Sequence, residues 1–476
     1  MKLQKGEIAI FFVTILYFFY QYFFHFSWDI MTYVLNSQSL FGQGHYYEVL
    51  RAPLMPLIMG ILQVFGWKLA EIIFIILVTI FFFYTMRVLA KSLKFDTITF
   101  LLIFISWYML HYSVSRGTEL LSLSLLMLGI AYMFNKKAIS GVFVGLAAIA
   151  RYNSAIYAIF LLFNDKKKII PSLIFFTIPL FLWGLYNRLV FGNFFTSHAD
   201  LYALNVTYRH YAVEAFPWLK LLGMFSICIP FIILGLINAI KKIKDKKNIV
   251  FLLILIFNLL YFIKLPTKDM RYLFNIILPV AYFCYLGIHT VGRKFKIKAR
   301  HIAIGIFILN LLFLACAEMY AEHPQDKIYK DTFDVLDKNC STISNGWIML
   351  NYYGMPTKKI QRAAQVPIRI SEGERIVLFP KLGEPAYASN DSFLEQFPIL
   401  YRNDDVIILG NGKCLPHNVK TETYLEELDR YIFEIHGYHI NTNPCMQMFR
   451  KIALVEKACN LLNYGRFSID KNRVIE

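Results

Sequence analysis

Charged side chains are scarce in this chain of 476 residues. Asp, Glu, Lys and Arg make up 17% of it, whereas hydrophobic residues make up 57% and phenylalanine alone occurs 44 times. A soluble domain carries about 25% charged residues and has no apolar runs long enough to span a bilayer. The composition therefore excludes an ordinary soluble protein and predicts a polytopic α-helical membrane protein.

Signals for cleavage and for metal binding are also lacking. The first apolar run, residues 7–26, follows Lys2 and Lys5 but has no small-residue cleavage site behind it, so we expect it to remain as an anchor rather than leave as a signal peptide. The seven cysteines show no metal-ligand spacing. A divalent metal has only a weak candidate, His45 with Glu48, and no cofactor is indicated.

The net charge of +17 is unevenly distributed. Residues 321–476 hold 19 basic and 20 acidic residues, which leaves 30 basic and 12 acidic residues in the first 320. Twenty of those 30 lie in six short clusters between apolar runs: Lys2/Lys5, Arg87/Lys91/Lys94, Lys136/Lys137, 166–168, 241–247 and 293–300. Such clusters mark cytoplasmic loops and do not form a nucleic-acid-binding patch.

The basic clusters also predict the topology. If all six lie on one side, an even number of spans separates neighbours, so residues 27–68 form one external loop whose apolar part lies along the interface. The spacing between Lys137 and Lys166 then requires a short hairpin that turns at Arg151. We expect about eleven transmembrane helices, with the amino terminus inside and the carboxyl terminus outside. Residues 1–320 form this membrane domain.

Residues 321–476 differ in character. Charge is balanced. Three short β-branched runs that we expect to be strands (346–350, 375–379 and 406–409) precede two amphipathic stretches at 422–435 and 446–462. This pattern predicts a soluble extracytoplasmic α/β domain. Its four cysteines allow three pairings, of which we favour Cys340 with Cys414 and Cys445 with Cys459; an external location permits both.

Ten basic residues of the membrane domain lie outside the six clusters. The predicted topology places all of them on the external side, where the positive-inside rule expects few basic residues: Arg51, Lys68, Arg116, Arg151, Arg188, Arg209, Lys220, Lys264, Lys268 and Arg271. Interfacial snorkelling accounts for lysines such as Lys68. The arginines instead indicate an anionic partner in the outer half of the bilayer. Asp29 and Glu119 are expected to face the same compartment, although each is also a plausible first-turn helix acid.

Six motifs in order resemble the GT-C fold glycosyltransferases, in particular the protein mannosyltransferase and aminoarabinose transferase-like group (glycosyltransferase family 39-like). They cover residues 1 to about 320: Asp29 after the first span, Tyr46-Tyr47 before Arg51-Ala52-Pro53, Glu119 opening a span, 141–153 ending in Arg151-Tyr152-Asn153, 183–193, and Arg271-Tyr272. The chain departs from the family where Ile30 replaces a second acid and Ala52 replaces a proline.

The resemblance implies transfer of a sugar, mannose or a similar hexose or pentose, from a polyprenyl or dolichyl phosphate to an acceptor hydroxyl. It makes Asp29 the base, with inversion at the sugar. Glu119 is also expected in the catalytic site, where it would orient the acceptor or an arginine. The implied substrate-binding residues are Arg51, Tyr46, Tyr47, Arg151, Asn153, Lys268, Arg271 and Tyr272. The implied partners are membrane lipids and a protein, glycan or lipid acceptor, with no nucleic acid.

General chemistry agrees with this assignment. A sugar phosphate ester has a good leaving group, so an alcohol acceptor needs a base but no general acid. Arginine suits the departing phosphate because its planar fork binds two oxygens and stays charged. The alternative is a transporter or flippase for an anionic lipid, but the sequence has neither paired halves nor a deep acidic relay.

Overall fold

The computed structural model of the chain describes residues 4–25, 27–114, 117–204, 215–225, 227–265, 268–319, 326–360, 362–383, 385–417 and 423–439. Contacts divide it into two units. Unit 1 comprises 1–30, 52–190 and 212–324, and unit 2 comprises 31–51, 191–211 and 325–476. The tail, residues 325–476, therefore shares a unit with two segments of the first 320 residues, 31–51 and 191–211.

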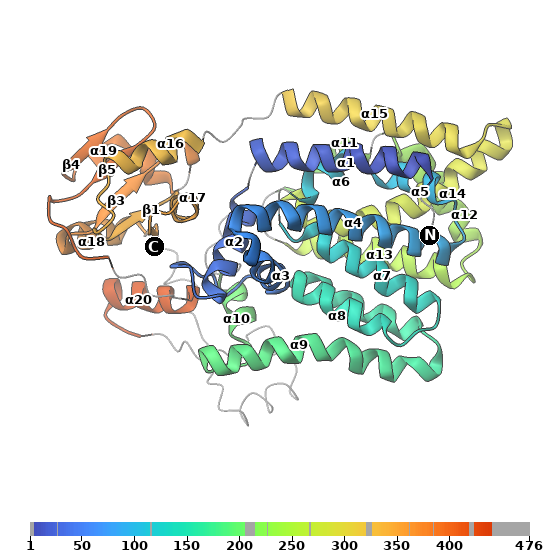
Figure 1. Ribbon diagram of the computed structural model, residues 1–476, viewed down its shortest axis with the longest axis horizontal. Helices are drawn as coiled ribbons and strands as arrows, with labels where there is room; N and C mark the ends of the chain where they lie inside the picture. Colours follow the sequence, from blue (N-terminus) through green and yellow to red (C-terminus); the bar gives the residue numbers. More distant parts are fainter. Residues whose placement is uncertain are drawn as a thin grey trace. The chain divides into compact units, whose positions relative to one another are not determined.

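Unit 1 is a bundle of apolar helices (Figure 1). Its main elements are α1 (Lys5–Phe24), α3 (Leu54–Leu62), α4 (Trp67–Leu93), α5 (Thr97–Phe104), α6 (Trp107–Ser113), α7 (Glu119–Phe134), α8 (Ser140–Ala150), η2 (Tyr152–Phe163), α9 (Ile169–Phe191), α11 (Trp218–Phe225), α12 (Ile229–Lys241), α13 (Lys246–Lys264), η5 (Met270–Ile276), α14 (Ile277–Phe295) and α15 (Ala299–Met319). Shorter 3-10 turns are η1 (Gln63–Phe65) and η3 (Lys166–Lys168).

Among the described residues, six helices are long and apolar enough to cross a membrane, or seven if α11 and α12 count as one span bent by 88°. The chain is a membrane protein. The expected span over 97–113 is two helices, because the Ser106 hydroxyl accepts the Met109 N–H and starts α6 anew. Other expected spans are shorter than the roughly 20 residues of a straight crossing, so the count of eleven stays a prediction.

The expected hairpin between Lys137 and Lys166 is present. Arg151 interrupts the helical backbone with φ −155° and ψ 112°, between α8 and η2. At the other end the Asn164 amide donates to the Lys137 carbonyl at 3.1 Å and to the Ser140 hydroxyl at 3.2 Å. The two limbs therefore begin and end together, and Arg151 lies at the tip.

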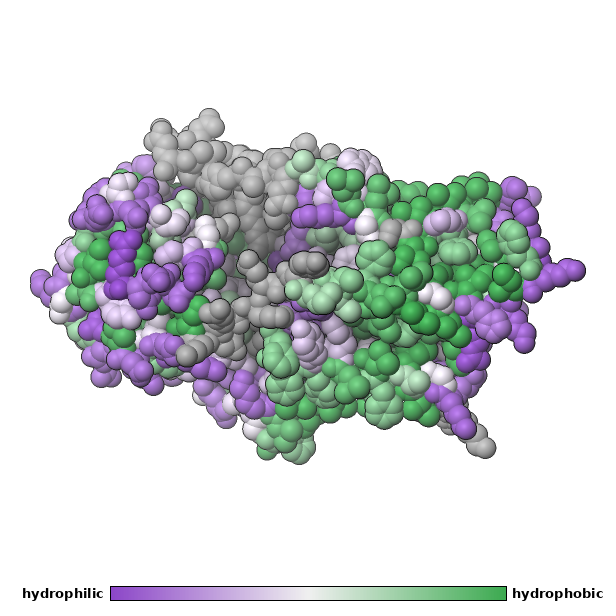
Figure 2. Space-filling view, turned by 90° about the horizontal axis from the view of Figure 1, so that it is seen from above, coloured by the Kyte–Doolittle hydropathy of each residue, from purple (hydrophilic) through white to green (hydrophobic). Residues whose placement is uncertain are grey.

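One end of unit 1 collects the basic clusters, as the charge pattern predicts. The contacts that join them are Arg87 with Glu7 at 3.1 Å, Lys247 with the Ser92 carbonyl at 3.0 Å, and Lys136 with Asp165 at 3.9 Å. Lys246 also lies close enough to Lys136 for the two charges to repel each other. Figure 2 shows hydrophilic residues at one end of this unit and an apolar surface along its side. Because α1 and α8 start from the basic end, Asp29 and Arg151 are carried to the opposite end.

Two glycines set the closest approach of α12 and α14. A Cβ atom on Gly235 would collide with the Phe283 carbonyl, and one on Gly287 with the Phe231 carbonyl. Small residues allow helix backbones to pack at such short range in a membrane, where packing rather than hydrophobic burial drives association.

We expect Gly235→Ala to destabilise the bundle by about 1 to 3 kcal/mol, the usual cost of overpacking. Thermal unfolding of the purified protein in detergent measures this effect. Gly305→Ala is the matched control, since no atom lies within 4 Å of the added methyl group. Equal melting temperatures for both variants would contradict the close α12–α14 contact.

Unit 2 contains a five-stranded sheet of order β2-β1-β3-β5-β4, parallel across β2, β1 and β3 and antiparallel beyond. The elements are α2 (Trp28–Leu40, which starts in unit 1), α10 (Thr196–Ala203), α16 (Asp326–Asp331), η6 (Thr332–Asp334), β1 (Thr342–Ser344), α17 (Trp347–Tyr352), β2 (Lys358–Lys359), η7 (Ala363–Gln365), α18 (Val366–Glu372), β3 (Arg375–Leu378), η8 (Pro380–Leu382), η9 (Ala386–Ser389), α19 (Asp391–Leu394), β4 (Ile399–Arg402), β5 (Ile407–Leu409) and α20 (Tyr424–His436). Ile343, Ile376 and Leu409 lie in its buried core.

The extended runs predicted at 375–379 and 406–409 are β3 and β5, and the amphipathic stretch 422–435 is α20. The strand expected over 346–350 is wrong, because these residues begin helix α17. The chain turns there because the Asn345 amide pairs in both directions with the backbone of Phe379. The stretch 446–462 lies outside the described residues.

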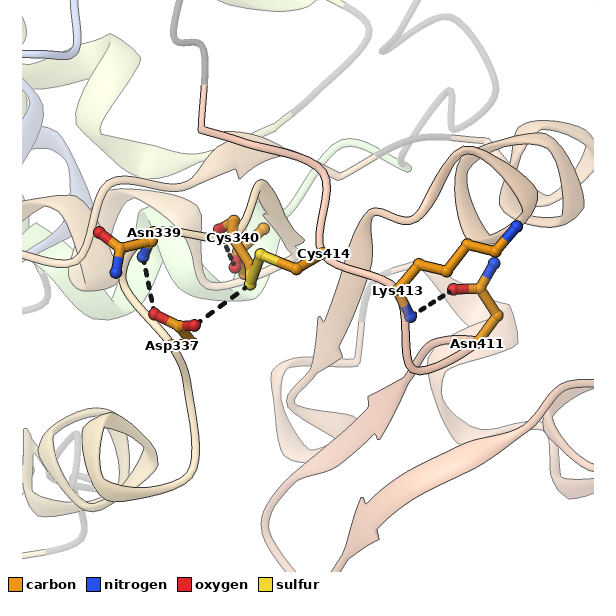
Figure 3. The surroundings of a disulfide bond; sticks show 7 residues. Asp337, Asn339, Cys340, Asn411, Lys413 and Cys414 are labelled. Atoms are coloured by element: carbon orange, nitrogen blue, oxygen red, sulfur yellow. Dashed lines mark hydrogen bonds between the residues drawn. A yellow bond between two sulfur atoms is a disulfide. The ribbon is translucent and has the colours of Figure 1, made fainter.

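A disulfide joins Cys340 and Cys414, as favoured from the sequence, and closes a loop across 74 positions (Figure 3). Asp337 lies beside it and accepts the Asn339 N–H at 3.0 Å. The expected second pair, Cys445 and Cys459, lies outside the described residues.

Replacing both bonded cysteines, as Cys340→Ser with Cys414→Ser, should lower the free energy of unfolding of the tail by about 2 to 5 kcal/mol, because a long loop regains its chain entropy in the unfolded state. Urea unfolding of the full protein, followed by limited proteolysis of the tail, measures the loss. Cys316→Ser, at an exposed free cysteine, should change nothing, and an unchanged midpoint in the double variant would contradict the prediction.

Candidate active site

Two acid–arginine pairs meet at the end of unit 1 that lies opposite the basic clusters. Asp29, in the first turn of α2, forms an ion pair with Arg271, the second residue of η5. Glu119, the first residue of α7, pairs with Arg151 at 2.9 Å. The two pairs are linked, because Arg151 Nη2 donates to the Arg271 carbonyl at 3.2 Å. Residues up to 242 positions apart in the sequence therefore form one charged cluster.

The local sequence explains why Arg271 points at this cluster. Asp269 caps η5 by accepting the Arg271 backbone N–H at 3.0 Å, and its second oxygen lies 3.0 Å from Arg271 Nε. The Tyr108 hydroxyl donates to the Met270 carbonyl at 2.6 Å and fixes the same turn from α6. Arg271 is thus bracketed by Asp29 and Asp269.

The cluster is largely shielded from water. Exposure of the side chain is 12% for Asp29, 17% for Arg271, 5% for Glu119 and 13% for Arg151. In such a setting each charge depends on its partner, since an isolated buried charge costs several kcal/mol. A ligand that brings a new negative charge would compete with the carboxylates for the two guanidinium groups.

The other residues predicted to bind substrate in unit 1 have different surroundings. Lys268 is buried and donates to the carbonyls of Phe262, Ile263 and Leu265, so it caps the end of α13. The Tyr272 ring lies 5.3 Å from the Arg271 guanidinium carbon. Asn153 contacts Tyr261 through its side chain.

Unit 2 holds the remaining predicted residues, built around a carboxylate that sequence reasoning considered only as a partner of His45. Glu48 accepts the Tyr46 hydroxyl at 2.8 Å and Arg51 Nε at 2.7 Å. Its backbone pairs with the Asn36 amide of α2 in both directions, each at 2.8 Å. Tyr47 stacks on Phe191 with ring centroids 6.1 Å apart.

A second cluster of unit 1 had no signal in the sequence. Glu318, near the end of α15, accepts the Tyr17 hydroxyl at 2.6 Å and pairs with His25 at 2.9 Å and His111 at 3.5 Å. These contacts join α1, α6 and α15 near the carboxyl-terminal ends of α1 and α15. Only the fold could bring these residues together, since they are separated by up to 301 positions.

Among the described residues, one group has the close spacing of metal ligands, Asp337 with Cys340 and Cys414. Its two cysteines are bonded to each other, which removes both thiolates that a metal would need. The acid–arginine cluster has the opposite character, because each carboxylate is matched by a guanidinium. Its donor set fits an anion rather than a cation.

No protein-family model and no curated protein sequence matches the chain. Two solved structures share its architecture. ArnT from Cupriavidus metallidurans bound to undecaprenyl phosphate has a TM-score of 0.55 at 11% identity, covering 87% of this chain and 100% of that one. The same protein in the apo state also gives 0.55, at 10% identity and 84% and 97% coverage.

ArnT is an aminoarabinose transferase of the GT-C fold. The likeness extends over both units of this chain, including its tail. The resemblance drawn from the six motifs is therefore confirmed at the level of the fold: this chain is a membrane protein with the GT-C architecture of ArnT.

Proposed function

We propose that the chain is a glycosyltransferase that moves a sugar from a polyprenyl phosphate to an acceptor hydroxyl on the external face of the membrane. The observation that carries the proposal is the linked pair of acid–arginine contacts, Asp29 with Arg271 and Glu119 with Arg151, in a fold shared with ArnT. The bound undecaprenyl phosphate of ArnT supports a lipid phosphate as the ligand.

The proposed reaction is a single displacement with inversion. The acceptor oxygen forms a bond to the anomeric carbon while the bond from that carbon to the phosphate oxygen breaks. The acceptor proton passes to Asp29, and the polyprenyl phosphate leaves with the electron pair. Asp29 is proposed as the base because an alcohol needs one in the transition state, whereas the phosphate needs no general acid.

Arg271 and Arg151 are proposed to receive the charge that develops on the leaving phosphate. Fixed donors aimed at developing charge contribute roughly 2 to 4 kcal/mol each in comparable sites. Glu119 then acts through Arg151, which it holds at 2.9 Å. When the donor phosphate engages Arg271, Asp29 loses its cationic partner and becomes the stronger base, because an opposite charge favours the ionised form of a carboxylate.

The remaining predictions from the sequence complete the proposal. The active end and the tail are external, about eleven helices cross the membrane, and Arg51, Tyr46 and Tyr47 serve the donor. The sugar is mannose or a similar hexose or pentose, and the acceptor is a protein, glycan or lipid. The basic clusters gathered at the other end of unit 1 support this orientation through the positive-inside rule.

The deciding experiment reconstitutes the purified protein in liposomes with a labelled undecaprenyl-phosphate-linked sugar and an extract of cell-envelope acceptors. We expect a covalently labelled acceptor together with one equivalent of free undecaprenyl phosphate. Movement of the labelled lipid between leaflets with no covalent product would overturn the proposal in favour of a transporter or flippase.

A further inference from the structure

A chain of hydrogen bonds inside unit 2 runs from the soluble tail to Arg51. Trp347 Nε1–H donates to the Tyr46 hydroxyl at 2.8 Å, and that hydroxyl donates to Glu48 Oε1 at 2.8 Å. Glu48 Oε2 in turn accepts Arg51 Nε at 2.7 Å. Tyr46 and Glu48 thus link Trp347 of the tail to the guanidinium of Arg51, which lies 296 positions earlier in the sequence.

Each step of this chain has a fixed direction. The indole N–H of Trp347 can only donate a hydrogen bond, so the Tyr46 oxygen must accept it. The Tyr46 hydroxyl in turn donates its own hydrogen bond to Glu48. Burial, together with the nearby carboxylate of Glu48, raises the pKa of the Tyr46 hydroxyl well above its usual value, so that proton is retained. Glu48 is 4% exposed, so little water reaches its carboxylate. Its second oxygen accepts its hydrogen bond from Arg51 instead.

The tail end of the chain is anchored in the sheet. Strand β1 leads into Asn345, whose amide pairs with the Phe379 backbone after β3 at 3.0 and 2.8 Å. Helix α17 starts two residues later with Trp347, and the Asn351 amide donates to the Trp347 carbonyl at 2.7 Å. The indole is consequently carried by a helix that follows directly from the sheet.

The guanidinium end is also constrained. The Arg51 guanidinium carbon lies 5.6 Å from the centroid of the Tyr33 ring. Burial lowers the pKa of Arg51, but the carboxylate of Glu48 opposes this, and the net effect is a pKa above the usual arginine value. Arg51 stays charged with its Nε edge turned to Glu48, which fixes the plane of the fork that binds phosphate oxygens.

Stability alone is a weak reason for this arrangement. A buried ion pair contributes little net stability compared with packed apolar residues of similar volume, but it fixes orientation. A directed chain that ends on a guanidinium therefore fits a binding role better than a purely architectural one. Tyr424 of α20 lies close enough to Glu48 and Arg51 for their charges to act on its hydroxyl, so a second element of the tail adjoins the same point.

We propose that Trp347 is a positioning residue for Arg51, so that the soluble tail takes part in binding the phosphate of the lipid donor. The proposal rests on the function proposed above, because it takes Arg51 to be a ligand of that phosphate. It assigns the tail a part in donor binding, whereas the sequence left its role open.

The test is a double-mutant cycle with undecaprenyl phosphate as the probe, measured as binding to the full-length protein in nanodiscs. Trp347→Phe keeps the ring and loses the N–H, and should weaken binding about 3- to 10-fold, the range expected for one hydrogen bond. Arg51→Gln should weaken it further. In the Arg51→Gln background, Trp347→Phe should have no additional effect, because its influence passes through Arg51.

Two further variants keep the test decisive. Tyr46→Phe breaks the chain in the middle and should reproduce the loss seen with Trp347→Phe, even if one of the two folds poorly. Tyr431→Phe, at another buried tyrosine of the tail, should bind like the wild type and reports any general weakening of the tail.

The outcomes separate the two proposals. Suppose that the wild type binds undecaprenyl phosphate. If Trp347→Phe then weakens binding equally with and without Arg51, or does not weaken it in the wild type, the positioning role is overturned and the proposed function stands. If the wild type fails to bind the lipid phosphate, both are overturned.

Discussion

Asp29→Asn should abolish sugar transfer, with a fall in kcat on the order of 10²- to 10⁴-fold, the usual contribution of a positioned general base. Asparagine has nearly the same shape but cannot accept the proton of the acceptor hydroxyl. The binding of undecaprenyl phosphate should persist or strengthen, because Arg271 loses a competing carboxylate. Transfer is therefore expected to be lost while lipid binding is kept or strengthened.

The matched control is Asp391→Asn. Both aspartates lie in the first turn of a helix, Asp29 in α2 and Asp391 in α19, so the control isolates any effect of a first-turn acid on its helix. We expect transfer by this variant to remain within about twofold of the wild type. Transfer by Asp29→Asn at the wild-type rate, with equal protein in the membrane, would remove Asp29 from the mechanism.

Arg271→Gln is expected to lose both activity and stability. Transfer should fall about 10²- to 10³-fold through loss of a donor to the leaving phosphate. The free energy of unfolding should fall by about 3 kcal/mol, because Asp29 is left as a shielded charge without its guanidinium. Rates in liposomes and thermal unfolding in detergent measure the two losses separately.

The double variant Asp29→Asn with Arg271→Gln separates the two roles. Stability should return most of the way to wild type, since neither charge is left alone, whereas transfer should stay at its lowest level. Arg402→Gln serves as control, because it breaks an exposed pair with Asp391 and exposed pairs contribute at most about 1 kcal/mol. Recovery of transfer together with stability would show that the Asp29–Arg271 pair is only architectural.

The sequence predicted the members of the unit 1 cluster because membrane chemistry makes them conspicuous. An arginine on the side where the positive-inside rule expects few basic residues needs a specific explanation, and Arg151 and Arg271 were found this way. Asp29 and Glu119 were found because the predicted topology places both on that side and the ordered motifs include both. Their pairing could not be predicted. It depends on how α7, the hairpin tip and η5 pack, and no periodicity in the sequence fixes that packing.

Glu48 and Asp269 were missed as site residues for a different reason. Each lies in a short segment between helices, where an acid is ordinary, and each acts on an arginine two or three positions away. The incorrect strand at 346–350 has a related cause: an apolar run that short fits a strand or a helix equally well. The Asn345–Phe379 contact, a tertiary feature, decides in favour of the helix.

The separation of Asp29 from Arg271 also has a consequence for biosynthesis. A ribosome completes α1 and Asp29 some 240 residues before Arg271, which at about 5 to 20 residues per second is an interval of tens of seconds at most speeds. Throughout that interval the carboxylate must remain hydrated at the membrane surface, because its guanidinium does not yet exist. The nascent chain therefore carries its proposed base in an inactive setting, and the charged cluster can assemble only after η5 has been made.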